Sequence, residues 1–156
     1  MNERYEPKSD FLRAFIADEI PLTGSALAEA NLRKLVSMTR DDDRSNRDWA
    51  TMLLAQEAID TSEVRTALLA AANDEDDVVR AEAMLGLAMR DKNLALPFVL
   101  RALLGDFACM AVFEAAELLA DPALVEPLRS WTEPSENNFL DRLARNALIA
   151  CESGER

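Results

Sequence analysis

The sequence predicts an all-α protein, an α-solenoid in which about nine helices are stacked in pairs. Alanine and leucine are abundant, aromatic residues make up only 6%, and long β-branched runs are absent, a composition that favours helices over strands. The aspartates Asp41, Asp74 and Asp106 recur at intervals of 33 and 32 residues. A recurrence of 20–50 residues is typical of stacked repeats.

Three columns of residues keep the register of these aspartates. Nine residues after each aspartate stands an alanine, and four residues later a leucine, so that both lie on one face of a helix. Six residues before each aspartate stands another leucine. Each unit therefore has a first helix after its aspartate and a second helix before the next one. The columns are Ala50, Ala83 and Ala115; Leu54, Leu87 and Leu119; and Leu35, Leu68 and Leu100.

The N-terminal half is expected to contain an atypical repeat, residues 10–40, and a regular one, residues 41–73. In the first, Asp10–Ile20 forms a helix that Pro21 ends, and Ser25 caps a helix reaching about residue 39. In the second, one helix is expected at about 45–58, and another runs from a capping box at Asp60 to about residue 72. An atypical terminal repeat shields the end of a stack.

The C-terminal half is expected to contain repeats at 74–105 and 106–132 and a capping helix at 137–151, all within a single domain, 1–156. Helices are predicted at about 77–89 and 94–104, with Pro97 inside the first turn of the latter. The next helix starts at Phe107, and its apolar opening through Phe113 predicts the most buried helix. Asp121 caps a short helix that ends near Trp131.

The clearest copy of the repeat contains a D-x-D-x-x-V-R-x-x-A run, here Asp74, Asp76, Val79, Arg80 and Ala83. The preceding copy has Asn46 in the valine place, and the following copy has Val112 in the arginine place. The run resembles the HEAT-like repeat family in its short bacterial form, over roughly residues 24–150. The resemblance implies a right-handed α-solenoid of stacked HEAT-like helix pairs. It also implies that Asp74 and Arg80 tie successive repeats together and that second helices line the concave surface.

The charge and the cysteines restrict the partners and the compartment. A formal net charge of −12 disfavours nucleic acid and anionic membranes, so the expected partner is another protein or a peptide. Met1–Lys8 does not read as a signal peptide, and no stretch approaches a membrane span. Cys109 and Cys151 lie in apolar surroundings, as expected of buried free thiols. A cytoplasmic location fits these features best.

The sequence offers no recognisable catalytic, metal or cofactor site. There is no histidine, which removes the commonest general base and metal ligand. The four glycines form no phosphate-binding loop. The acidic runs at 41–43 and 74–77 lack a calcium-binding loop and are expected to be solvated turns between repeats.

Trp49 and Met52 form the first candidate contact site. Trp49 stands where the next copies have Glu82 and Glu114, which are expected to face solvent, and Met52 lies one turn further on. An exposed tryptophan–methionine patch suits a binding surface. Alternatively, the N-terminal segment folds over Trp49 through Tyr5 or Phe11.

The second candidate site is a basic groove on the second helices. Their arginines outnumber the acids, and Phe98 is placed beside them. We expect this groove to bind an acidic or carboxylate-bearing segment of a partner. Alternatively, these arginines form ordinary surface ion pairs. The groove residues are Arg33, Arg65, Phe98, Arg101 and Arg129.

These features favour a non-enzymatic protein-interaction module, serving as an adaptor, a scaffold or a neutralising partner. Two alternatives follow from resemblance to relatives of this fold. One is an accessory or lyase-type protein related to bilin lyases. The other is a DNA glycosylase, which the acidic charge disfavours because such an enzyme needs a strongly basic groove.

Overall fold

The computed structural model describes residues 6–154 of the chain. These residues form nine α-helices and two short 3-10 helices, and no strand is present among them, so the predicted all-α fold is confirmed. The α-helices are α1 (Asp10–Ile16), α2 (Ala26–Met38), α3 (Arg44–Gln56), α4 (Ser62–Ala71), α5 (Asp77–Arg90), α6 (Lys92–Leu103), α7 (Met110–Leu119), α8 (Val125–Arg129) and α9 (Asn138–Ser153). The 3-10 helices, η1 (Pro122–Leu124) and η2 (Ser130–Thr132), flank α8.

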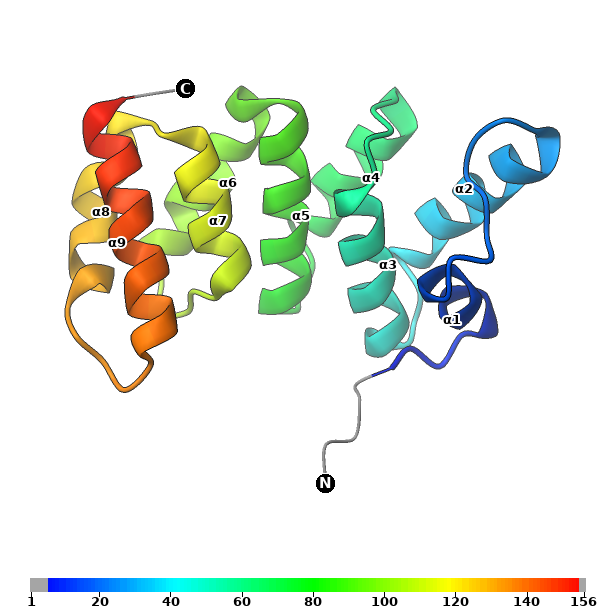
Figure 1. Ribbon diagram of the computed structural model, residues 1–156, viewed down its shortest axis with the longest axis horizontal. Helices are drawn as coiled ribbons and strands as arrows, with labels where there is room; N and C mark the ends of the chain where they lie inside the picture. Colours follow the sequence, from blue (N-terminus) through cyan, green and yellow to red (C-terminus); the bar gives the residue numbers. More distant parts are fainter. Residues whose placement is uncertain (1–5, 155–156) are drawn as a thin grey trace.

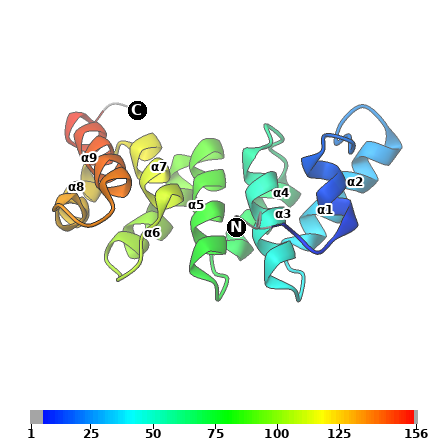
Figure 2. The same cartoon turned by 60° about the horizontal axis from the view of Figure 1, so that its bottom comes forward.

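The helices form a linear stack of two layers. Figures 1 and 2 show the units following one another from α1 and α2 at one end to α8 and α9 at the other. The first helices of the units, α3, α5 and α7, pack extensively side by side, and α9 continues this layer. The second helices, α2, α4, α6 and α8, contact one another over only a few residues.

The two layers differ in how closely their helices pack. The first helices α3, α5, α7 and α9 lie close together, whereas the second helices α2, α4, α6 and α8 are more widely spaced. That the second helices line a concave surface stays a prediction.

The aspartates of the repeated run build the turn before each first helix. Asp76 caps α5 by accepting hydrogen bonds from the backbone N–H groups of Val78 and Val79, and Asp43 caps α3 in the same way through Asn46. The carboxylate of Asp74 accepts the N–H of Asp76 at 2.9 Å, which fixes the turn itself. The two aspartates of the run thus have different local roles.

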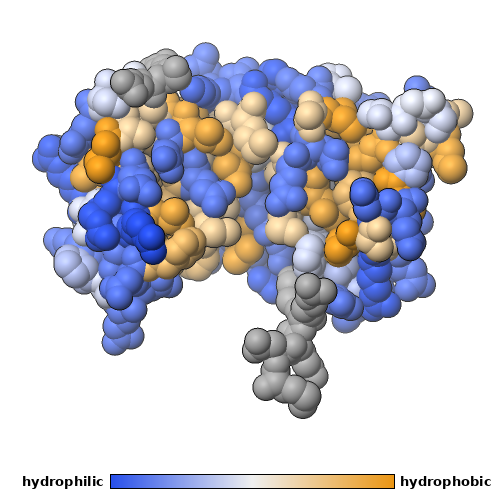
Figure 3. Space-filling model, viewed as in Figure 1, coloured by the Kyte–Doolittle hydropathy of each residue, from blue (hydrophilic) through white to orange (hydrophobic). Residues whose placement is uncertain are grey.

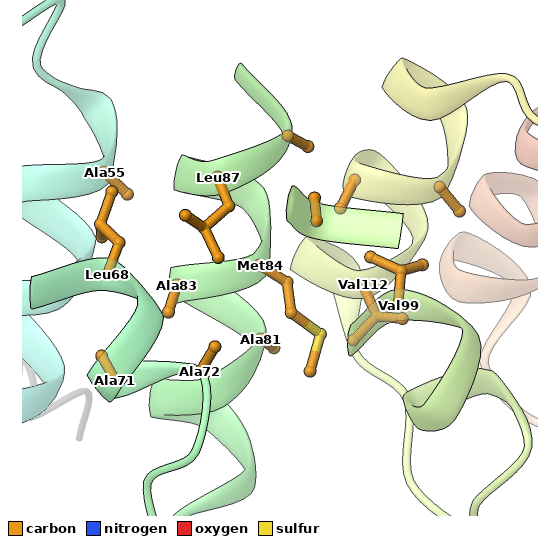
Figure 4. Packing of buried hydrophobic residues seen from close by; sticks show 14 of the residues in the cluster. Ala55, Leu68, Ala71, Ala72, Ala81, Ala83, Met84, Leu87, Val99 and Val112 are labelled. Carbon is orange, nitrogen blue, oxygen red and sulfur yellow. The ribbon is translucent and has the colours of Figure 1, made fainter. Parts of the chain in front are cut away.

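The repeat columns form the core between the two layers. The alanines Ala50, Ala83 and Ala115 are completely buried, and the leucine column beside them is buried too. Figure 4 shows Ala83 and Leu87 of α5 within this packing. The closest approach is at Gly86, where an added Cβ atom would lie 2.8 Å from the Cβ atom of Ala55. Small residues therefore allow the first helices to approach one another.

Three helix boundaries differ clearly from the sequence prediction. The first is the end of α1, which stops at Ile16, four residues before the expected Ile20. Asp91 accepts the N–H groups of Asn93 and Leu94, so α6 starts at Lys92 and Pro97 lies inside the helix. Pro97 has no N–H group, so the backbone carbonyl of Asn93, four residues earlier, is left without its helical donor. Pro97 and Asn93 are both exposed, so water can bind this carbonyl. In the next unit, α7 starts at Met110, three residues later than expected, and Phe107 lies outside it with 41% of its surface exposed.

Polar side chains tie the units 41–73 and 74–105 together. The guanidinium of Arg47 binds the Asp74 carboxylate, with Nε 3.0 Å and Nη2 3.4 Å from its two oxygens. Arg65 on α4 reaches Asp91 of the following unit. At the end of α5, Arg90 donates hydrogen bonds to carbonyl oxygens at 2.6–3.1 Å, most of them in the preceding unit. These carbonyls belong to Leu54, Ala55, Glu57, Ile59 and Gly86.

Candidate functional site

A groove of about 490 Å³ opens where the unit 74–105 meets the unit 106–132. It lies at the ends of α4 and α6 and at the starts of α5 and α7, along the edge formed by the acidic turns. Both apolar and charged side chains line it. We call it the Arg101 groove; its residues are Ala72, Asn73, Asp74, Asp77, Arg80, Met84, Phe98, Arg101, Ala102, Gly105, Asp106, Phe107 and Val112.

Two arginines face this groove in different states. Arg101 is exposed, and its guanidinium carbon lies 5.8 Å from the centre of the Phe98 ring. No carboxylate pairs with Arg101 among residues 6–154. Arg80 donates to the backbone carbonyl of Asp74 at 2.7 Å and pairs with Asp77 in its own first turn. Arg101 is therefore the cation that the groove leaves open to a ligand.

The three aspartates of the groove are engaged to different degrees. Asp74 is held by Arg47, and Asp77 by Arg80. Asp106 is exposed, and it takes part in no ion pair within the described part of the chain. The groove thus has one open cation, Arg101, and one open anion, Asp106, above a floor that includes the buried side chains of Met84 and Val112.

The structure brings together only part of the sequence-predicted basic groove. Phe98 and Arg101 share the Arg101 groove. Arg65 lies near the opposite end of its helix, where Asp60 and Asp91 pair with it at 2.7 and 3.2 Å. Arg129 is exposed and pairs with Glu126 one turn away.

Arg33 is exposed on α2 and does not line this groove. Ion pairing thus accounts for Arg65 and Arg129, as the alternative expectation held. It does not account for Arg101.

Trp49 and Met52 are both half-buried. The indole of Trp49 packs against the core cluster. The N-terminal segment reaches the same helix: the Ser9 N–H donates to the Asn46 side chain at 2.9 Å, and Lys8 pairs with Asp43 at 2.9 Å. Phe11 instead stacks with Lys34, and Tyr5 lies outside the described residues.

Glu82, expected to face solvent, is largely buried between first helices. Burial raises the pKa of Glu82 to about 10, and a hydrogen bond with the nearby Asp48 raises it further. No donor among the described residues reaches the buried Oε2 atom of Glu82. With this pKa Glu82 is protonated at neutral pH, next to Asp48, which is itself buried. The burial of Glu82 could not be predicted from the sequence, because it depends on how close α3 lies to α5.

Cys109 and Cys151 carry free thiols. Burial raises the pKa of both thiols, that of Cys151 to about 11, which makes them poor nucleophiles. No group of three or more potential metal ligands occurs in the described part of the chain. None of its helices is long and apolar enough to cross a membrane. The apolar patches of the face in Figure 3 are separated by polar side chains.

The comparisons with known proteins agree with this architecture. A family model described as HEAT repeats matches residues 32–120, more than half of the 156-residue chain. The chain belongs to the HEAT repeat family.

A curated relative and a solved structure extend this HEAT repeat assignment. Protein YibA of Escherichia coli, strain K12, is 24% identical over 123 residues, which cover 76% of this chain and 44% of YibA. YibA of the O157:H7 strain matches equally well. The X-ray structure of YibA has 22% identity and a TM-score of 0.61, covering 81% of this chain and 50% of YibA. The chain thus spans about half the length of these relatives, and the structural likeness shows the shared fold alone.

Two groove residues, Arg80 and Phe107, were not among the sequence candidates. Arg80 was expected to be a structural tie between HEAT repeats, and Phe107 was expected inside a buried helix. The sequence carries no signal for this difference, because Arg80 and Arg47 occupy the same place in the run. The fold alone shows that Arg80 pairs with Asp77 of its own helix and leaves Asp106 unbound.

Proposed function

We propose that this HEAT repeat chain is a non-enzymatic protein-binding module that holds a segment of a partner protein in the Arg101 groove. The observation that carries the proposal is the groove itself, an open volume of about 490 Å³ beside an unpaired arginine and two phenylalanines. Arginine and aromatic residues are enriched where protein interfaces concentrate their binding energy. Stacked repeats commonly present extended surfaces of this kind to partners.

The apolar part of the groove would supply most of the contact area. Phe107 is 41% exposed, and Phe98 is half-buried beneath Arg101. An apolar side chain of the partner would cover Phe107 and reach toward the buried Met84 and Val112. Full burial of such a side chain contributes about 1.5–3 kcal/mol.

Site-specific photo-crosslinking tests this proposal. A photo-reactive phenylalanine analogue is placed at Phe107 in the groove, and separately at Leu27, which is exposed on the distant helix α2. In extracts of the native host, the probe at Phe107 should give one dominant adduct that is absent from the Leu27 sample. Phe98→Ala should reduce this adduct in the Phe107 background. Identical adducts from both positions, or none from Phe107, would contradict the proposal.

A further inference from the structure

The chain shows how its own fold binds a carboxylate at a junction between units. At the junction before α5, Arg47 forks onto the Asp74 carboxylate, with Nε and Nη2 at 3.0 and 3.4 Å from its two oxygens. Both side chains are nearly covered, with exposures of 13% and 11%. A forked contact between arginine and carboxylate is strong and directional. At this junction the carboxylate is supplied from within the chain.

The next junction presents the same arrangement without the contact. In the repeat register, Arg80 corresponds to Arg47 and Asp106 corresponds to Asp74. Arg80 does not bind Asp106; it pairs with Asp77 in an exposed contact three residues away on its own helix. Such pairs contribute little stability, so this arginine remains available to a better placed carboxylate.

We infer that the Arg101 groove recognises an aspartate or glutamate side chain of its partner, with Arg101 as the main anchor and Arg80 as the second donor. This inference rests on the proposed protein-binding function and specifies its ligand. An apolar side chain next to the carboxylate fits the same groove, because Phe98 and Phe107 line it together with the arginines. The guanidinium of Arg101 already lies over the Phe98 ring. Because this stacking restricts the Arg101 side chain before binding, less conformational entropy is lost when a ligand binds.

The overall charge does not decide between an acidic and a basic ligand. At physiological salt, exposed charges more than about 8 Å apart are largely screened, so the net charge of −12 acts mainly on the rate of approach. Within the groove, Asp74 and Asp77 are already paired, whereas Asp106 is not. Asp106 is therefore the local charge that opposes an acidic ligand. Its replacement by a neutral residue distinguishes an acidic ligand from a basic one.

Four acetylated peptides of the same length test the inference by NMR titration of the full chain. The first carries a glutamate beside a leucine and has an amidated C-terminus. The second has glutamine and the third lysine in the glutamate position. The fourth is the glutamine peptide with a free C-terminal carboxylate, and it distinguishes a side-chain carboxylate from a chain terminus. Shifts of the Arg101 side-chain N–H and of the Phe98 ring report on the site.

The glutamate peptide should bind about tenfold or more tightly than the glutamine peptide, since a hydrogen bond to a charged group is involved. Arg101→Gln should abolish this preference. Arg33→Gln, a change at an exposed arginine outside the groove, should preserve it. Asp106→Asn should strengthen binding of the glutamate peptide several-fold. Equal unfolding midpoints of the variants, measured by circular dichroism, show that the fold is unchanged.

Several outcomes would overturn the carboxylate inference. They are equal affinity for the glutamate and glutamine peptides, tighter binding of the lysine peptide, tighter binding of the peptide with the free C-terminus, and absence of binding by all four. None of them removes the crosslink expected at Phe107. A failure of carboxylate recognition is thus distinguishable from a failure of the proposed protein-binding function.

Discussion

Replacement of Glu82 by glutamine should stabilise the chain at neutral pH. The folded protein keeps this side chain protonated, because burial and the neighbouring Asp48 raise its pKa from the ordinary value of 4.5 to about 10. In the unfolded chain the same group is ionised above pH 4.5. Folding at pH 7 therefore requires uptake of a proton, which costs up to about 3 kcal/mol at about 1.4 kcal/mol per pH unit. Glutamine needs no proton.

The sign of the pH dependence follows from this proton uptake. Below pH 4.5 both states are protonated, and the hydrogen bond with Asp48 contributes its full stability. As pH rises from 4.5 toward 10, the folded state holds more protons than the unfolded state, and stability falls. Because partial exposure lets water reduce the effect, we expect Glu82→Gln to stabilise the chain by about 1–3 kcal/mol at pH 7.

Urea unfolding followed by circular dichroism between pH 5.5 and 8 measures this effect. The chain contains no histidine, so no histidine titrates in this window and obscures the slope. The stability of the parent should fall relative to Glu82→Gln as pH rises. Glu114→Gln, at the equivalent position of the next unit, controls for exchanging a carboxylate for an amide. Parallel curves for the parent and Glu82→Gln would refute the reasoning, because Glu82 would then be ionised in the fold.

Four further substitutions, one of them a control, test the packing and the ties between units by the same unfolding assay. Gly86→Ala should destabilise by about 1–3 kcal/mol because its Cβ would lie 2.8 Å from that of Ala55. Gly105→Ala, whose Cβ would come no closer than 3.4 Å to its neighbours, should change stability by less than about 0.5 kcal/mol. Arg90→Met should cost about 2–4 kcal/mol, since it removes the guanidinium hydrogen bonds to five partly buried carbonyl groups. Trp131→Phe should cost about 1 kcal/mol by deleting the 2.8 Å bond from Nε1 to the Leu103 carbonyl, and no loss would mean that water replaces the indole.

The repeat spacing predicted the helices and the core because both depend on local periodicity. The alanine column that defined the register is completely buried. An alanine followed by a leucine four residues later indicates one face of a helix, and this holds regardless of which element the helix packs against. The same reasoning failed at α7, where the apolar residues from Phe107 to Cys109 precede the helix. Hydrophobicity marks contact surface, but it does not mark the first hydrogen-bonded turn.

The side-chain partners could not be predicted, because they depend on how far apart the helices lie. From the sequence, Arg65 is expected to be a free arginine on the surface. In the structure it pairs with Asp91, 26 residues away. Glu82 occupies a position that is solvent-exposed on an isolated helix, but the closeness of α3 buries it beside Asp48. In both cases the deciding residue lies in a neighbouring unit. Predicting it would require the inter-unit geometry in addition to the repeat.

The two junctions of α5 show how a repeat protein can divide stability and binding between successive interfaces. Toward α3, Arg47, Arg65 and Arg90 tie the units through carboxylates and carbonyls. Toward α7, Arg80 has the position of the tying arginine but pairs with Asp77 of its own helix, and buried apolar side chains such as Met84 hold the helices together. Apolar packing is sufficient for that junction, because stability in stacked repeats is roughly a sum of neighbouring interfaces. The polar groups at its edge, Arg80 and Arg101, are therefore available to contact another molecule.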